Sequence, residues 1–230
     1  MKNIIITLVL SHYFIPVFAQ DVTYDMHGLY SNPVKKEILN DAKTMSDINP
    51  GYPSSWVSDY ISAEISATCN GKVMNAKSPN DKLSTDQKNI LASADLGTDI
   101  DFDIMYNYKN SATDISEMHG MHFTYTVVPE IEAEYPGGHQ QMKQYLDEKI
   151  IHKISQNNSK KIKQAIVRFT IDETGKIVNS KIITSSDDLQ TDNIILKAIN
   201  KMPKWKPAEE ANGSKVKQEF EIRVGNDEGC

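Results

Sequence analysis

The order of periodicities in the second half of the sequence constrains the fold more than any other feature. A helical run is followed by two strand-like runs, a second helical run and a last strand-like run. Two helices can cover one face of a three-stranded antiparallel sheet, so this order predicts an α+β domain over residues 135–225. The helical runs lie within 142–154 and 192–202, and the strand runs are 165–172, 176–184 and 216–224.

The segment KMPKWKP, residues 201–207, predicts a rigid corner after the second helix. Pro203 has no N–H and disfavours helical geometry in the residue before it, so the helix must end there. Trp205 carries a large apolar area that needs cover, and Pro207 keeps the following connection extended. We therefore expect Pro203, Trp205 and Pro207 to form a structural corner that positions the last strand.

The first half predicts a second, smaller unit that is rich in strands. Three segments alternate apolar and polar residues, and Ser84 with Gln87 forms the pattern that begins a helix. We predict a small β-rich, sandwich-like module over 58–134 and a loop-rich lead-in over 21–57. The alternating segments are 58–69, 98–109 and 121–128, and the lead-in is expected to hold a short helix around 34–43.

Charge differs between the two halves. Residues 21–134 carry 8 basic and 18 acidic side chains, whereas residues 135–230 carry 16 basic and 13 acidic side chains. This contrast favours two units that meet near Glu134 and Tyr135. The basic half is only weakly positive and its charges are interleaved with acids, so we expect no nucleic-acid partner.

Residues 1–20 have the pattern of a secretory signal peptide. A basic Lys2 precedes an apolar stretch over 4–10, and Val17-Phe18-Ala19 fits a cleavage site. An uncleaved anchor is the alternative, but the apolar stretch is short for a bilayer span of about 20 residues. We expect a periplasmic protein, exported and associated with the envelope, with residues 226–230 as a tail.

The sequence has two cysteines, Cys69 and Cys230. Export permits a disulfide between them, but two cysteines are no disulfide framework. We expect Cys69 to be a buried strand residue.

Two clusters contain side chains of the kinds that form chemical sites. Met118-His-Gly-Met-His122 offers ligands that suit a soft metal, and Met26-His27 repeats this weakly, but no further ligand spacing supports a site. Asp99, Asp101 and Asp103 alternate, as expected for the solvated face of a strand. No nucleophile or phosphate-binding motif is present. We therefore predict no enzyme, cofactor, metal or small-molecule substrate.

Four segments together resemble the C-terminal domain of TonB-type energy transducers, in its Bacteroidetes-type version. The most specific of them is the corner after the second helix. A second Tyr-Pro pair before the first strand and a Pro-rich spacer, both usual in transducers, are missing. The matching segments are YPGG at 135–138, VRFTIDETGKI at 167–177, DLQTDNIILKAINKMPKWKP at 188–207 and NGSKVKQEFEIRV at 212–224.

The resemblance implies how a partner would bind. Domains of this family pair a sheet edge with an extended segment of an outer-membrane transporter, which is β-augmentation. The expected edge is the last strand, with its charged side chains exposed; a protected edge or a self-dimer is the alternative. The partner-binding candidates are Val216, Lys217, Gln218, Glu219, Phe220, Glu221, Ile222 and Arg223.

Two functions follow as expectations. In the first, a non-enzymatic periplasmic protein docks a partner segment on this strand, linked to transmembrane transport. In the second, the protein is a structural adaptor or dimerising scaffold of an envelope assembly, and the N-terminal β-module carries recognition.

Overall fold

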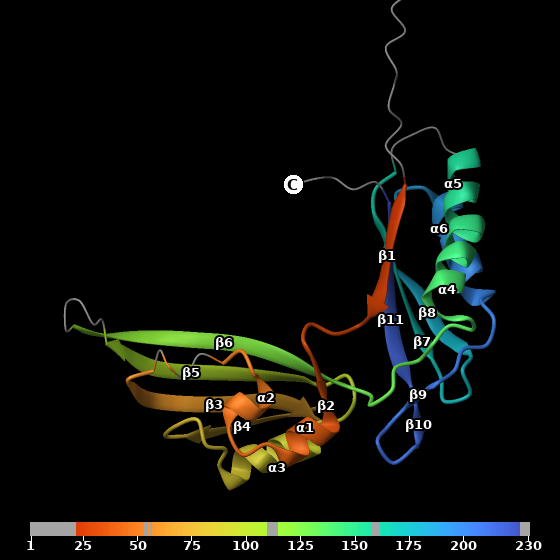
Figure 1. Ribbon diagram of the computed structural model, residues 1–230. Coiled ribbons are helices and arrows are strands. Elements are labelled where there is room, and N and C mark those ends of the chain that lie inside the picture. The colour runs from red at the N-terminus through yellow and green to blue at the C-terminus, as the bar shows by residue number, and fades with distance from the viewer. Residues whose placement is uncertain (1–21, 53–54, 56, 110–114, 158–161, 226–230) are drawn as a thin grey trace, which may run out of the picture.

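A computed structural model describes residues 22–52, 55, 57–109, 115–157 and 162–225. The predicted signal peptide, Cys230 and the tail lie outside these residues. The described chain has two separate hydrophobic cores, one in each half. Figure 1 shows two units set at an angle, each with a sheet that carries its helices on one side.

The C-terminal unit is built on a four-stranded antiparallel sheet in the order β1-β11-β7-β8. The α+β class predicted for this half is confirmed. The predicted three strands are present, and a fourth, β1, comes from the N-terminal end of the described chain. The strands are β1 (Thr23–Gly28), β7 (Ala165–Ile171), β8 (Ile177–Thr184) and β11 (Gln218–Gly225).

Helices cover one face of this sheet (Figure 1). Met142, Leu146, Ile150 and Ile154 are buried at a constant spacing of four residues. In a pure α-helix each step of four turns a side chain by about 40° away from the sheet. The wider π turn in the middle reduces this drift and keeps all four facing the core. The helical segments are α4 (Gly138–Leu146), the π turn η2 (Asp147–Ile151), α5 (His152–Asn157) and α6 (Leu189–Asn200).

The corner after α6 is an aromatic cluster. Trp205 is 3% exposed, and its ring lies 5.2 to 6.3 Å from the rings of Phe220, Tyr135 and Phe169. Its backbone N–H donates to the carbonyl of Gly175 in the β7–β8 turn. A Cβ at Gly175 would lie 2.0 Å from the Trp205 carbonyl oxygen, so this contact requires glycine. The corner thereby ties the connection to the sheet.

The N-terminal unit is a five-stranded sheet in the order β2-β6-β5-β3-β4. Its predicted strands are confirmed, but the sandwich is not, because helices instead of a second sheet cover it. Gln87 both caps α3 and, fully buried, donates to the Ala63 carbonyl. The elements are β2 (Pro33–Lys35), α1 (Lys36–Asp41), α2 (Met45–Ile48), β3 (Asp59–Cys69), β4 (Lys72–Ser78), α3 (Thr85–Ser93), β5 (Asp99–Lys109) and β6 (Ser116–Val128).

The described part of the lead-in over 21–57 forms more regular structure than its composition indicates. Its first part forms β1 in the C-terminal sheet, and its second part supplies β2, α1 and α2 to the N-terminal core. Cys69 is buried at the end of β3, as predicted. Within the described chain, no helix combines the length and the apolar character that crossing a membrane would need.

Candidate partner-binding strand

The last strand, β11, lies inside the sheet. It pairs with β7 along one side and with β1 along the other, from Thr23 opposite Gly225 to Gly28 opposite Phe220. The prediction of an open edge at Val216–Val224 is therefore wrong. The sequence of the last strand gives no sign of this, because the covering strand lies at the other end of the chain.

The eight predicted binding residues do not form one continuous strand. Val216 belongs to β10 (Lys215–Val216), which pairs with β9 (Ala208–Glu209). Lys217 lies between the two strands and is exposed, and its Nζ is 3.8 Å from a carboxylate oxygen of Glu173. The remaining six, from Gln218 to Arg223, belong to β11. Within this run Phe220 and Ile222 face the helical core.

Glu221 differs most from expectation. It was predicted to be exposed, but it is only 4% exposed and lies between two arginines. Arg168 on β7 donates to one carboxylate oxygen at 3.1 Å, and Arg223 donates to the other at 3.0 Å. Burial raises the pKa of this carboxyl, but the arginine hydrogen bonds and charges outweigh it, and the net pKa is lowered.

β1 is held by its backbone and by two half-buried side chains, Tyr24 and Met26, which pack against the C-terminal core. The Tyr24 hydroxyl donates to the Lys143 carbonyl of α4 at 3.3 Å. Burial, together with the Asp147 carboxylate, raises the pKa of Tyr24 to about 12, so this hydroxyl remains a donor at neutral pH. Sequence reasoning missed these residues, although their alternation in TYDMHG is a weak strand signal.

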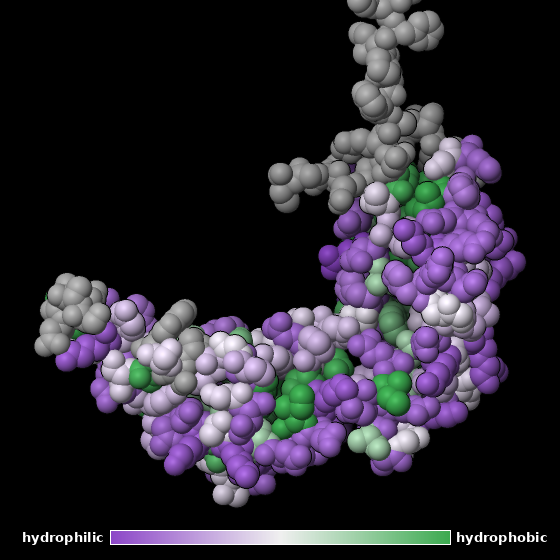
Figure 2. Space-filling model, in the orientation of Figure 1, coloured by the Kyte–Doolittle hydropathy of each residue, from purple (hydrophilic) through white to green (hydrophobic). Residues whose placement is uncertain are grey.

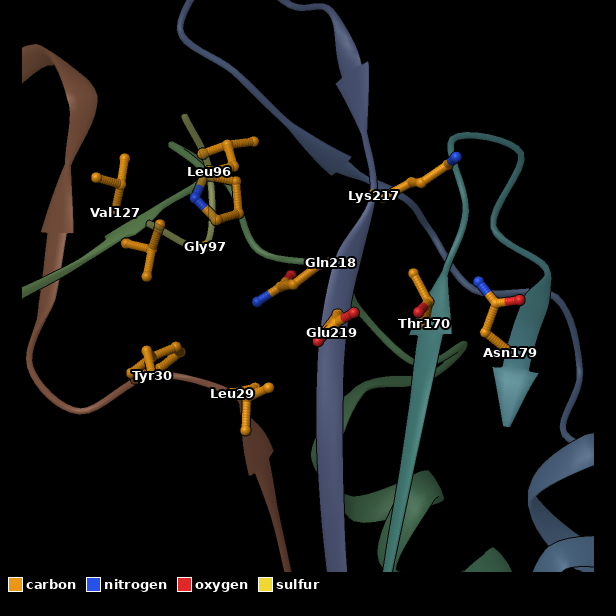
Figure 3. Close-up of a pocket in the computed structure, with 12 residues that line it drawn as sticks. Leu29, Tyr30, Leu96, Gly97, Val127, Thr170, Asn179, Lys217, Gln218 and Glu219 are labelled. Carbon is orange, nitrogen blue, oxygen red and sulfur yellow. The ribbon is translucent and has the colours of Figure 1, made fainter. Parts of the chain in front are cut away.

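A cavity of about 410 Å³ lies at the end of β11, where the two units meet (Figure 3). Lys217, Gln218 and Glu219 line it from the C-terminal unit, and Leu96 and Val127 line it from the N-terminal unit. The surface is mostly hydrophilic, and apolar residues gather where the units meet (Figure 2). The cavity brings three predicted binding residues next to the N-terminal module.

Gln218 connects the two units through hydrogen bonds. Its Oε1 accepts the backbone N–H of Ala133 at 2.7 Å, and its Nε2 donates to Glu132 at 3.2 Å. The Tyr30 hydroxyl donates to the other carboxylate oxygen of Glu132, also at 3.2 Å. The Gln218 side chain is therefore buried in a structural role.

The two clusters weighed as chemical sites meet on the open face of the N-terminal sheet. Met118–His122 lies within β6. His122 Nδ1 is 2.8 Å from Asp103, and the Thr124 hydroxyl donates to Asp101 at 2.6 Å. The Asp103 hydrogen bond and charge raise the pKa of His122. The part of the chain that the structure describes holds no group of three or more ligating residues suited to a metal.

Comparison with known families agrees with this geometry. A family model described as "TonB C terminal" matches residues 140–224, from α4 to the end of β11. No curated protein and no solved structure matches the chain. The match begins after β1 and the N-terminal module and covers neither of them. Residues 140–224 are therefore similar to a TonB C-terminal domain.

Proposed function

We propose that this chain is a non-enzymatic periplasmic protein that binds an extended segment of another protein by adding it to β11. An outer-membrane transporter is the first candidate for the partner, because TonB-like domains act in envelope transport. The residues that would pair with the partner are the β11 part of the predicted set, from Gln218 to Arg223. Lys217 and Val216 would flank the docked segment.

One observation carries this proposal. β11 pairs with a strand that is not its neighbour in sequence, since Thr23 and Gly225 are 202 positions apart. No hairpin forces this pairing, so it depends on the backbone groups and side chains that the two strands offer each other. A strand that accepts a distant segment of its own chain has the chemistry to accept a segment of another. Partner binding at this edge then requires β1 to leave.

The two faces of β11 would have different roles in binding a segment. Phe220 and Ile222 keep the strand in the core, while Glu219 and Arg223 are exposed on the other face. Main-chain hydrogen bonds would give a docked segment its affinity, and the exposed side chains would select among segments.

Site-specific photo-crosslinking in the native host tests the proposal. A photoreactive phenylalanine would replace Glu219 on β11, with a matched control at the half-buried Asp101 on the open face of the N-terminal sheet. Both positions lie on strands, but Glu219 detects partners of the C-terminal unit and Asp101 detects partners of the N-terminal unit. We expect Glu219 to crosslink to an outer-membrane protein and Asp101 not to do so. Products at Glu219 that contain only other copies of this chain would contradict the proposal.

A structural adaptor is the second candidate, and one observation favours it. β6 pairs with β5 from Ser116 to Thr126, but with β2 only from Thr126 to Val128. In the described residues, the other side of β6 between Ser116 and Tyr125 has no strand beside it. Such an edge can recruit a partner strand or a second copy of the chain. Crosslinks to a foreign protein from Asp101 alone would favour this adaptor.

A further inference from the structure

β1 differs from every other strand in the C-terminal sheet in how it is connected. β7 and β8 are joined by a short turn, and β11 follows the corner after α6. β1 precedes the whole N-terminal module, and its end leads directly into β2 of that module (Figure 1). It can therefore leave the sheet without breaking any connection between the three strands of the TonB-like domain.

The contacts of β1 are those of a replaceable segment. Six residue pairs form its register with β11, and Leu29 continues this by donating to the Glu219 carbonyl at 3.0 Å. Tyr24 and Met26 pack against the core, but neither side chain is fully buried. Backbone pairing is available to any extended segment, so Tyr24 and Met26, together with Val22 just before the strand, distinguish β1 from other occupants on this face.

The opposite face of β1 meets positive charge. Asp25 lies opposite Arg223, and His27 lies opposite Glu221. The same row continues through Arg168 on β7 to Lys181 on β8. Arg168 and Arg223 contact the buried carboxylate of Glu221, and Lys181 lies one strand further along this row. An acidic residue at the position of Asp25 is complementary to this face, because opposite charges on facing strands stabilise the pair.

We propose that β1 is a built-in competitor for the β11 edge, and that its sequence shows which segments can replace it. The occupant is an extended protein segment in which one acidic residue separates two apolar residues, as Asp25 separates Tyr24 and Met26. This inference rests on the proposed function. It defines the chemistry of the partner segment and identifies β1 as the segment that regulates its binding. A segment of this chemistry gains the contacts that β1 gives up.

Peptide binding to the full mature chain tests the proposal. The probe is a fluorescently labelled peptide with the sequence of residues 22–29, and binding is followed by fluorescence anisotropy. In the test chain, Tyr24→Ser and Met26→Ser loosen β1. We expect the loosened chain to bind the probe at least about tenfold more tightly than the unaltered chain does, since two apolar contacts of β1 have been removed. A probe with the same two substitutions should not bind.

The charge at Asp25 gives a second readout that does not depend on loosening the core. A probe with Asp25→Lys should bind the loosened chain about two- to fivefold more weakly. Arg223→Glu in the chain should reverse this preference. In the otherwise unaltered chain, Asp25→Lys changes only an exposed residue and should increase binding of the native probe. Equal binding of the native, serine and lysine probes would overturn the proposal, as would a folded, loosened chain that binds none of them.

The outcomes separate this inference from the proposed function. If the probes behave as expected but Glu219 crosslinks to no foreign protein in the host, the edge has the inferred preference and the proposed function fails. If Glu219 crosslinks to an outer-membrane protein but the probes do not discriminate, the function stands and the inferred partner chemistry fails.

Discussion

The two sheets of this molecule are completed in different ways. The N-terminal sheet takes all five strands from one continuous stretch, between Pro33 and Val128. The C-terminal sheet takes three strands from residues 165–225 and its fourth from Thr23–Gly28. The first sheet is therefore local in sequence, while the second is closed by a segment from the other end of the described chain.

The polar faces of the two sheets also differ, in whether their carboxylates are exposed or buried. On the N-terminal sheet, Asp101 and Asp103 face threonine and histidine partners and remain partly or fully exposed. On the C-terminal sheet, Glu221 is buried between Arg168 and Arg223, beside the strand that β1 covers. Burying a charge is costly unless it is paired, so this cluster fixes β11 to β7. Within the C-terminal sheet, a buried ion pair therefore joins β11 to β7, whereas backbone pairing and two half-buried side chains hold β1.

The largest effect should come from the aromatic corner. Trp205→Ala removes a fully buried ring and should lower the free energy of unfolding of the C-terminal unit by about 3–5 kcal/mol. The N-terminal core does not contain Trp205 and should be unaffected. Urea unfolding by circular dichroism, with hydrogen exchange to identify the unit that opens, measures this. The control is Leu189→Ala, at a residue that is 80% exposed, and it should change the free energy of unfolding only slightly. A change at Trp205 as small as that at Leu189 would refute the packed corner.

The buried carboxylate should have the next largest effect. Glu221→Gln keeps the shape but leaves two arginines without their partner, and should cost about 1–3 kcal/mol. The matched control is Glu219→Gln, an exposed residue on the same strand. The folded-state pKa of Glu221 is lowered, so its stabilising effect is present above the ordinary value of 4.5 and is lost as the pH falls through the folded-state pKa. The free energies of unfolding of the two variants should therefore converge at low pH. A difference between them that stays constant with pH would count against the pairing of Glu221 with the arginines.

A smaller loss is expected from β1. Tyr24→Ala removes a half-buried ring and its hydrogen bond to α4, and should cost the C-terminal unit about 1–2 kcal/mol. Asp25→Asn, on the exposed face of the same strand, should change stability by less than about 0.5 kcal/mol. Thermal unfolding of both variants measures the difference. A cost at Tyr24 as large as that at Trp205 would show that β1 belongs to the permanent core.

The smallest effect concerns the polar face of the N-terminal sheet. Asp103→Asn removes the hydrogen bond and charge that raise the pKa of His122, so this pKa should fall toward its ordinary value of 6.5. Because the folded-state pKa of His122 is raised, its contribution to stability is fully present below the ordinary value and is lost as the pH rises through the folded-state pKa. Titration of the His122 ring by NMR measures the change. An unaltered His122 titration would contradict the pairing with Asp103.

The sequence predicted the elements whose signals are local. The alternation in 165–184, the glycine turn at Gly175 and the proline that ends α6 each determine structure within a few residues, and all were found where expected. Trp205 was assigned to the core because an aromatic ring of that size needs cover.

The remaining features depend on distant contacts. β1 was missed because its strand signal is short and its partner lies 202 positions away. The alternation of the strand assigns Glu221 to the exposed face opposite Ile222, but Glu221 is buried there between Arg168 and Arg223, with His27 of β1 opposite it. An edge strand can be predicted from its own sequence only where no other segment covers it.

The most direct test of the account is a disulfide between the two strands. Asp25→Cys and Arg223→Cys place cysteines at directly opposite positions, which lie about 5.5 Å apart at Cα in antiparallel strands and fit a disulfide. Cys230→Ser removes the competing terminal thiol. The purified chain, with a photoreactive residue at Glu219, is mixed with solubilised outer membranes of the host. The reduced form serves as the control for the oxidised form of the same protein.

If β1 must leave before a partner binds, the reduced chain should crosslink to an outer-membrane protein and oxidation should abolish this product, because β1 can then no longer leave β11. Equal crosslinking by the reduced and oxidised forms would contradict it, since the partner would then bind without displacing β1.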